Sequence, residues 1–547
     1  MVKKFIDIRK EGYVFKKWTE NGEEIEVEAR FPRDRLKYTF KADGNRRIKA
    51  HFTKQFIEDE KIVSFVQSKL GISQDEYIGK ERLKELKIIE IPVGATSLEG
   101  LQYAENLAEI TFSNDNITDY SPLKDLQNLK TLSFSDINLD SLETFKELQQ
   151  IQEMRFYNDT VVNSLSGLEN FTSLEKMGFY GNTINDLRDI KHNQTIKKLR
   201  IVSVEIDDYK FLNKLPNLKH LSLTLDFDET TKIEDVKGLE EGLRNLTKLE
   251  SLFLTGIGID DVYVFKDMKK LNELYLSNSK IDSLEGIDKL PSLGKLELAS
   301  NEIKDNKALN GLSNVKTLRY IRNSNGDLSF VKELLNLSEL AIARQEIESL
   351  SFLSDKDNLY SLSLKENNIS DLSPLENLDN LEELDLSYNN ISDISSIKTL
   401  HNLKTLQLTD NQLSDISPVE NLTNLDTLLL RHNEIKCLTP LKNLYKLEEL
   451  TLSNNKVEDL TPLSSLSKLR GVALARNRIA DITPLAALEN VERIYLSGNL
   501  IEDFSLLFEF KSLKFVSLGS NNMEEAKLRE IANDLQKEGV DVFIEIF

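Results

Sequence analysis

Hydrophobic and polar residues alternate in short runs along most of the chain, and the runs recur at a fixed spacing. In LEELDLSYN, Leu384 and Leu386 alternate with polar neighbours, which is the period-two pattern of a short strand with one buried face. Apolar residues then follow at multiples of three, at Ile391, Ile394 and Leu400. This spacing predicts that each strand is followed by a 3₁₀-like or extended return segment.

Aligned segments from Leu359 onward repeat with a period of 22 residues. About twenty units begin at an apolar residue, and their first residues are 86, 107, 129, 151, 174, 196, 218 and 249, then every 22 residues to 513. The pattern LxxLxLxxN with a period in the twenties indicates a leucine-rich-repeat solenoid. Proline recurs in the return segments and excludes a long helix there. We therefore predict an α/β solenoid with a parallel sheet on the concave face and a 3₁₀ or extended convex face.

An asparagine follows the second strand leucine in the second half of the chain. Its amide can satisfy backbone groups that the inward turn would otherwise bury unpaired, so these side chains should form a ladder. The ladder positions are Asn367, Asn389, Asn411, Asn433, Asn455, Asn477, Asn499 and Asn521. In the first half the same position holds Ile137, Val204, Ile257 and Ser279. We expect apolar filling and less regular coils there.

Units of the form LxxLxLxxNxIxDIxPLxxLxN resemble the 22-residue class of internalin-like bacterial proteins, a class shared with the leucine-rich-repeat regulator of eukaryotic protein phosphatase one. FIEDEKIVSFVQSKLGIS is similar to the helical cap that opens many internalin-like arrays, with Val63, Val66 and Leu70 on one helical face. MEEAKLREIANDLQKEG and VDVFIEIF predict a closing helix and strand. The expected domains are a β-module at 1–55, a helical cap at 56–85, the solenoid at 86–520 and a C-terminal cap at 521–547.

Residues 1–55 carry a separate period-two pattern. Apolar alternation at 25–31, 36–42 and 48–52 predicts three strands of one meander, with a loop at 43–45 that places Phe40 opposite Ile48. The outward face would gather a basic patch of Lys37, Lys41, Arg47 and Lys49. Because no aromatic ladder shares that face, we interpret the module as a small sheet that leans on the repeats rather than as a nucleic-acid site.

The charge of the chain is unevenly divided. The net charge is −21, and residues 1–55 hold 15 basic against 9 acidic residues, so the rest of the chain carries −21 − 6 = −27. An acidic solenoid disfavours nucleic acid and anionic membrane and favours a protein partner with a basic surface. Solubility explains the same charge equally well.

Sequence patterns of catalysis and metal binding are missing from the chain. The histidines have no metal-ligand spacing, and they are His51, His192, His220, His401 and His432. Cys437 fills a repeat position that Asp393, Asp415 or Asp459 holds in other units. The acidic insert with Asp226, Asp228 and Glu229 lacks the glycine turn of a calcium loop. We therefore expect no enzymatic activity, no cofactor and no metal.

A partner would lie on the concave face, where the polar strand positions form a grid. Aromatic and arginine side chains dominate binding hot spots, so departures from polar consensus are informative. The predicted partner-binding residues are Tyr157, Tyr180, Phe253, Tyr275, Arg319, Arg322 and Arg344. Tyr495, Arg431 and Arg476 depart from consensus in the same way.

These observations favour a monomeric, non-catalytic scaffold for protein–protein interaction, similar in kind to internalin-like proteins. A regulatory subunit or inhibitor of a partner enzyme, of immunity or effector type, is the alternative. The sequence as written shows no signal peptide, anchor or membrane span, so we expect a cytoplasmic protein. A trimmed sequence would instead be compatible with a secreted or cell-surface one.

Overall fold

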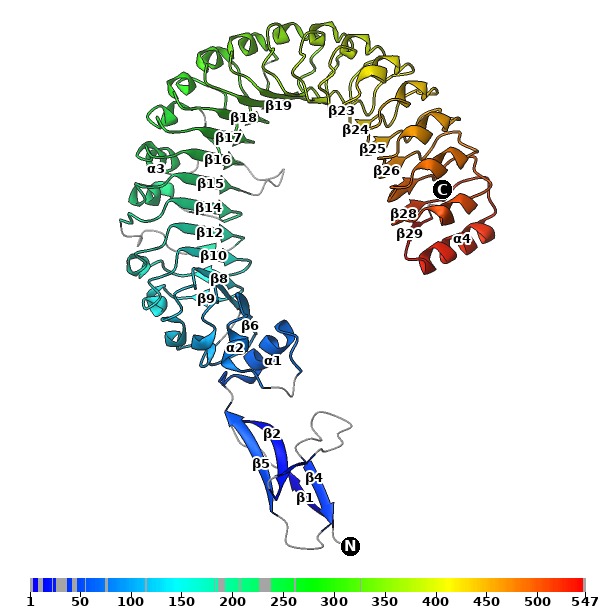
Figure 1. Ribbon diagram of the computed structural model, residues 1–547. Helices are drawn as coiled ribbons and strands as arrows, with labels where there is room; N and C mark the ends of the chain where they lie inside the picture. Colours follow the sequence, from blue (N-terminus) through cyan, green and yellow to red (C-terminus); the bar gives the residue numbers. More distant parts are fainter. Residues whose placement is uncertain are drawn as a thin grey trace. The chain divides into compact units, whose positions relative to one another are not determined.

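The computed structural model describes residues 3–7, 13–21, 23–25, 37–41, 47–54, 56–73, 77–113, 116–181, 183–184, 192–204, 206, 208–225, 238–259, 262–324 and 326–544. The chain divides into two units, Met1–Ile257 and Gly258–Phe547, and each is described by itself. Within each unit, parallel strands line the inner side of a curved ladder and short 3₁₀ turns form its outer side (Figure 1).

The N-terminal segment forms strands β1 (Lys3–Asp7), β2 (Tyr13–Glu20), β3 (Glu23–Ile25), β4 (Lys37–Lys41) and β5 (Ile48–Lys54). Strand β1 pairs antiparallel with β4, while β2 pairs antiparallel with β3 and β5. The predicted hairpin is therefore wrong, because Phe40 lies opposite Lys4 and Ile48 lies opposite Glu20. Strands β1 and β2, which the period-two pattern did not predict, supply these partners. Trp18 of β2 is only 2% exposed.

The predicted basic patch is only partly described. Arg47 and Lys49 are exposed, whereas the side chains of Lys37 and Lys41 and the loop at 43–45 lie outside the described residues. The acidic insert with Asp226, Asp228 and Glu229 also lies outside them. The patch and the insert stay predictions.

Two helices precede the first repeat, α1 (Glu60–Lys69) and α2 (Lys80–Leu83). The Asp59 carboxylate caps α1 by accepting from the amides of Lys61 and Ile62, and it also accepts from the Thr96 amide at 2.8 Å. Helix α1 buries Val66 as predicted, but Ile62 and Gln67 share its buried face, while Val63 and Leu70 are half-buried. One carboxylate thus joins the helix start to the first repeat.

The strands of the first unit form a parallel ladder in register, β6 (Ile88–Ile91), β7 (Glu109–Ser113), β8 (Thr131–Ser135), β10 (Glu153–Tyr157), β12 (Lys176–Tyr180), β14 (Lys198–Val202), β15 (His220–Thr224) and β16 (Ser251–Thr255). Aromatic rings replace leucines in its core. Phe112, Phe134, Phe156 and Phe179 stack in sequence, with ring centroids 5.8, 5.2 and 4.8 Å apart.

Three short strands follow long strands of the first unit, β9 (Asn138–Leu139), β11 (Val161–Val162) and β13 (Thr183–Ile184). The ladder position before β9 and β11 holds Ile137 and Asp159 in place of asparagine. The three short strands pair in parallel, and the Val161 amide donates to the Ile137 carbonyl at 2.9 Å. Val204 and Ile257 are buried, which confirms apolar filling at those two positions. The long unit that begins at residue 218 carries helix α3 (Leu239–Arg244).

The second unit continues the same architecture with β17 (Glu273–Ser277), β18 (Lys295–Ala299), β19 (Thr317–Ile321), β20 (Glu339–Ala343), β21 (Ser361–Ser363), β22 (Glu383–Asp385), β23 (Thr405–Gln407), β24 (Thr427–Leu429), β25 (Glu449–Thr451), β26 (Gly471–Ala473), β27 (Arg493–Tyr495), β28 (Phe515–Ser517) and β29 (Asp541–Phe543). Neighbouring strands pair in parallel. Helix α4 (Glu525–Lys537) precedes the last strand, β29, in the sequence and packs against it. The fold class predicted from the sequence is confirmed.

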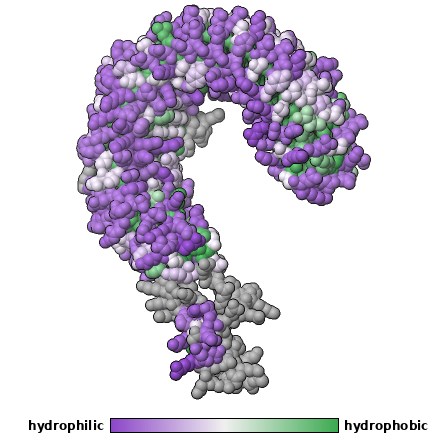
Figure 2. Space-filling view, viewed as in Figure 1, coloured by the Kyte–Doolittle hydropathy of each residue, from purple (hydrophilic) through white to green (hydrophobic). Residues whose placement is uncertain are grey.

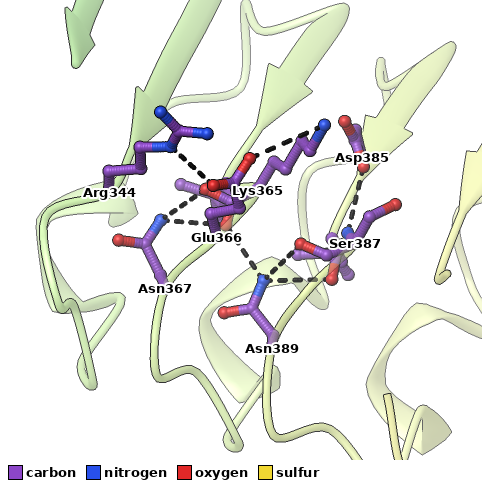
Figure 3. Close-up of polar contacts among 9 residues, drawn as sticks. Arg344, Lys365, Glu366, Asn367, Asp385, Ser387 and Asn389 are labelled. Carbon is purple, nitrogen blue, oxygen red and sulfur yellow. Dashed lines mark hydrogen bonds and ion pairs between the residues drawn. The ribbon is translucent and has the colours of Figure 1, made fainter. Parts of the chain in front are cut away.

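The predicted asparagine ladder is confirmed in the second unit (Figure 3). The Asn389 amide donates to the carbonyls of Leu364 and Leu386 at 3.0 Å and to that of Ser387 at 3.3 Å, while its oxygen accepts from the Ile369 amide at 3.0 Å. One buried side chain therefore satisfies backbone groups of its own repeat and of the preceding one.

The 3₁₀ returns begin with a second recurring contact. Asp415 accepts from the Ser417 amide and Asp459 from the Thr461 amide, both at 2.8 Å. Prolines 374, 418, 440, 462 and 484 occupy the first turn of these segments, where a missing amide hydrogen costs nothing. Hydrophilic residues cover most of the face drawn in Figure 2.

Candidate protein-binding surface

The solvent-facing side of the parallel strands, together with the left-handed residue that follows each strand, is called here the strand face. Its side chains lie in rows, because the strands pair in register. In the first unit one row runs Arg155, Gly178, Arg200, Ser222 and Phe253. The structure thus places Phe253 on the strand face, three strands from Tyr180, which is described next.

Tyr157 and Tyr180 form a stacked pair on the strand face. They are partners across β10 and β12, and their rings stand 5.0 Å apart at 16°. The Tyr180 ring folds back over Gly178, where an added Cβ would meet ring atoms at 2.7–3.0 Å. Both rings are half-buried, and burial raises the pKa of the Tyr180 hydroxyl. The missing side chain of Gly178 therefore leaves room for the ring.

Two guanidinium groups flank the tyrosine pair. Arg200 lies over the Tyr180 ring, 5.7 Å from its centroid. Arg155 donates to Glu153 at 2.9 Å and reaches across the intervening strand to Glu109 at 3.1 Å. Two carboxylates hold Arg155 in one orientation, so aromatic and cationic groups share a preorganised surface.

In the second unit, Tyr275 and Arg319 lie in one row on either side of Glu297. Arg319 is exposed and Tyr275 is half-buried, and burial raises the pKa of the Tyr275 hydroxyl. The structure therefore brings these two predicted residues onto the same face. Their role in binding stays a prediction.

Arg322 and Arg344 lie one residue beyond their strands, in the left-handed region with φ of 50° and 55°. The sequence grid did not distinguish this position from a strand position. Glycine holds the equivalent place at Gly498, with φ of 74°. Arg344 donates to Glu366 at 2.5 Å (Figure 3), so part of its charge is compensated within the protein.

An open hollow of about 650 Å³ lies farther along the strand face of the second unit. It forms because the strand of one repeat, GVALARN, places only the small residues Gly471 and Ala473 on this face. Glu449 reaches across Gly471 to form an ion pair with Arg493, two strands away. This Gly471 hollow is lined by Thr409, Leu429, Arg431, Glu449, Leu450, Thr451, Ser453, Asn454, Gly471, Val472, Ala473, Ala475, Arg476, Arg493 and Tyr495.

Within the described residues, no three His, Cys, Asp or Glu side chains are grouped closely enough to hold a metal ion. The same part of the chain contains no helix with the length and hydropathy of a membrane span. Cys437 is exposed, and its thiol contacts the Thr439 hydroxyl at 3.4 Å.

The parallel ladder, the asparagine ladder and the 3₁₀ returns together define a leucine-rich-repeat protein. The family model described as "Leucine Rich repeats (2 copies)" matches residues 357–399, 379–421, 401–443, 423–465 and 445–487. The comparison with curated proteins gave no match.

Three solved structures that are similar to this chain are described here, and two of them are internalins. Internalin C2 of Listeria monocytogenes is 39% identical; the match covers 34% of this chain and 82% of that one, with a TM-score of 0.33. An internalin, InlF, of the same organism is 23% identical over 80% of this chain and 95% of its own, with a TM-score of 0.31. A TLR13–ssRNA13 complex is 18% identical over 84% and 82%, with a TM-score of 0.55. The chain belongs to the internalin-like leucine-rich-repeat proteins.

Proposed function

We propose that the protein is a non-catalytic scaffold that binds a partner protein on its strand face, and that Tyr157 and Tyr180 are central to the contact. The observation that carries this proposal is their stacked, half-exposed arrangement over Gly178. Tyrosine supplies a large contact area at a small cost in conformational entropy. The internalin-like family supports the role of an interaction scaffold.

Preorganisation distinguishes this pair from scattered surface aromatics. Stacking fixes the two rings, and paired carboxylates fix Arg155 beside them. A partner would then meet an aromatic and cationic surface whose side chains are already ordered, which reduces the entropy lost on binding. The same proposal extends to Phe253 in the first unit and to Tyr275, Arg319, Arg322 and Arg344 in the second.

The test compares proteins captured by the wild-type chain with those captured by a Tyr157→Ala/Tyr180→Ala double variant. Tyr445 is exposed and lies outside the strand face, so Tyr445→Ala is the matched control. For a partner identified in this way and then purified, calorimetry should show at least about 100-fold weaker binding to the double variant, since each aromatic hot spot contributes about 2 kcal/mol or more.

The control should bind within about twofold of wild type. Equal binding of the partner to the double variant and to wild type would overturn the proposal for this surface. Variants of the second unit then test its arginines separately. Arg322→Gly and Arg344→Gly remove the side chains while keeping a residue suited to the left-handed backbone.

A further inference from the structure

The Gly471 hollow combines an apolar floor with a charged rim. Gly471 and Ala473 form part of the floor, and the Tyr495 side chain, 37% exposed, stands beside them with its ring 5.0 Å from that of Phe515. The volume falls within the range of ligand pockets, but the hollow opens broadly onto the strand face. An apolar centre within a polar rim is the anatomy of a protein–protein contact.

The charge of the hollow is opposite to that of the chain. Its lining includes the guanidinium groups of Arg431, Arg476 and Arg493 and the single carboxylate of Glu449, so 3 − 1 leaves a net charge of +2 in a chain of −21. Glu449 pairs with Arg493, and Arg431 and Arg476 are the other two cationic side chains of the lining. Both of them are exposed.

We propose that the Gly471 hollow binds an acidic segment of a partner protein. Carboxylates of the segment meet Arg431 and Arg476, because a guanidinium group binds a carboxylate through two parallel hydrogen bonds. An apolar side chain of the segment covers Ala473 and packs against Tyr495. This site is separate from the tyrosine pair of the proposed function, and it selects a partner chemistry opposite to the basic surface that the net charge favours.

Fluorescence anisotropy with the full chain tests the charge preference. The probe is a labelled peptide of about twelve residues in which glutamate and leucine alternate, so that it can lie extended along the strand face. Matched peptides carry glutamine or lysine in place of glutamate. We expect the glutamate peptide to bind at least about tenfold more tightly than either of the others, and to lose affinity as salt is raised.

Three variants locate the binding. Arg431→Glu reverses a rim charge, and Ala473→Phe fills the floor without changing charge; each should weaken binding of the glutamate peptide by about tenfold or more. Arg476→Gly removes a second rim charge at a left-handed position, where φ is 56°, so its fold is not put at risk. Arg478→Glu is the matched control, because Arg478 is exposed and does not line the hollow.

Equal affinity for the glutamate and glutamine peptides would overturn the proposal. So would an Arg431→Glu variant and an Arg476→Gly variant that both bind like wild type. The Tyr157→Ala/Tyr180→Ala protein should bind the glutamate peptide normally, so that failure of this proposal and failure of the proposed function are measured independently.

Discussion

Removing one amide from the asparagine ladder should destabilise the second unit more than its size suggests. In Asn389→Ala, the carbonyls of Leu364 and Leu386 and the amide of Ile369 each lose a partner at 3.0 Å, and the Ser387 carbonyl loses one at 3.3 Å. Asn389 is 7% exposed, so water does not readily replace these contacts.

The expected loss follows from those contacts. A net contribution of about 1 kcal/mol for each well-made hydrogen bond gives about 3 kcal/mol for the three shortest bonds. The lost packing of the truncated side chain adds to this figure, while a water molecule that enters the space would subtract from it. We therefore expect the free energy of unfolding to fall by about 3 kcal/mol.

Asn390→Ala is the matched control, because Asn390 is exposed and its side chain bonds to no group in the part of the chain that the structure describes. Its backbone amide donates to the Ile369 carbonyl, a bond that the substitution keeps. Urea unfolding gives the loss of stability for both variants. Hydrogen exchange locates it, since the Ile369 amide should lose protection in Asn389→Ala only. A difference between the two variants of less than about 1 kcal/mol would refute the reasoning.

Three further predictions concern single side chains. Cys437→Asp should raise the free energy of unfolding in urea by about 1 kcal/mol, because a carboxylate would accept from the Thr439 amide as in neighbouring repeats; an unchanged or lower value would contradict this. Lys356 is 4% exposed, and burial lowers the pKa of its ammonium group, which donates to the carbonyls of Lys332 and Leu334 at 2.8 and 3.2 Å. Lys356→Met should therefore raise the free energy of unfolding by about 1 kcal/mol; a lower value would show that the two hydrogen bonds outweigh the cost of desolvation. A hydrogen bond from Arg470 helps lower the pKa of Glu492 to about 2. The ionised Glu492 carboxylate therefore contributes its full stabilisation above the unfolded pKa near 4.5, and this contribution is lost as pH falls toward 2. The urea midpoint should fall more between pH 5 and 2 for wild type than for Glu492→Gln, and parallel curves for the two proteins would contradict the prediction.

The regular half of the fold could be predicted because each repeat poses the same physical problem. Every inward turn buries backbone groups, and the recurring asparagine is the residue that satisfies them. Where the first unit has Ile137 and Asp159 at this position, β9 and β11 supply backbone pairing instead, and such pairing requires no particular residue type. Ile137 at the ladder position predicted an irregular coil, but it did not predict the backbone pairing that replaces the asparagine side chain.

The N-terminal module shows the limit of period-two patterns. Alternation identified segments near β4 and β5, but pairing joins residues far apart in sequence, and the pattern of one strand does not specify its partner. The same limit applies to Arg322 and Arg344. Their spacing from the strand leucine is plain in the sequence, whereas the left-handed backbone that carries them appears only when the turn is described.

The position of the Gly471 hollow could be predicted from the sequence by a different criterion, the small size of neighbouring side chains. Large aromatic and arginine side chains indicate positions that protrude from the sheet, such as Tyr495, Arg431 and Arg476, but they do not show that these side chains surround one depression. A depression on a regular sheet arises where side chains are small, and the strand of GVALARN has only Gly471 and Ala473 on this face. Gly178 beneath Tyr180 has the same character. On a repeat surface, small residues therefore locate space for a partner, and the large residues beside them determine its chemistry.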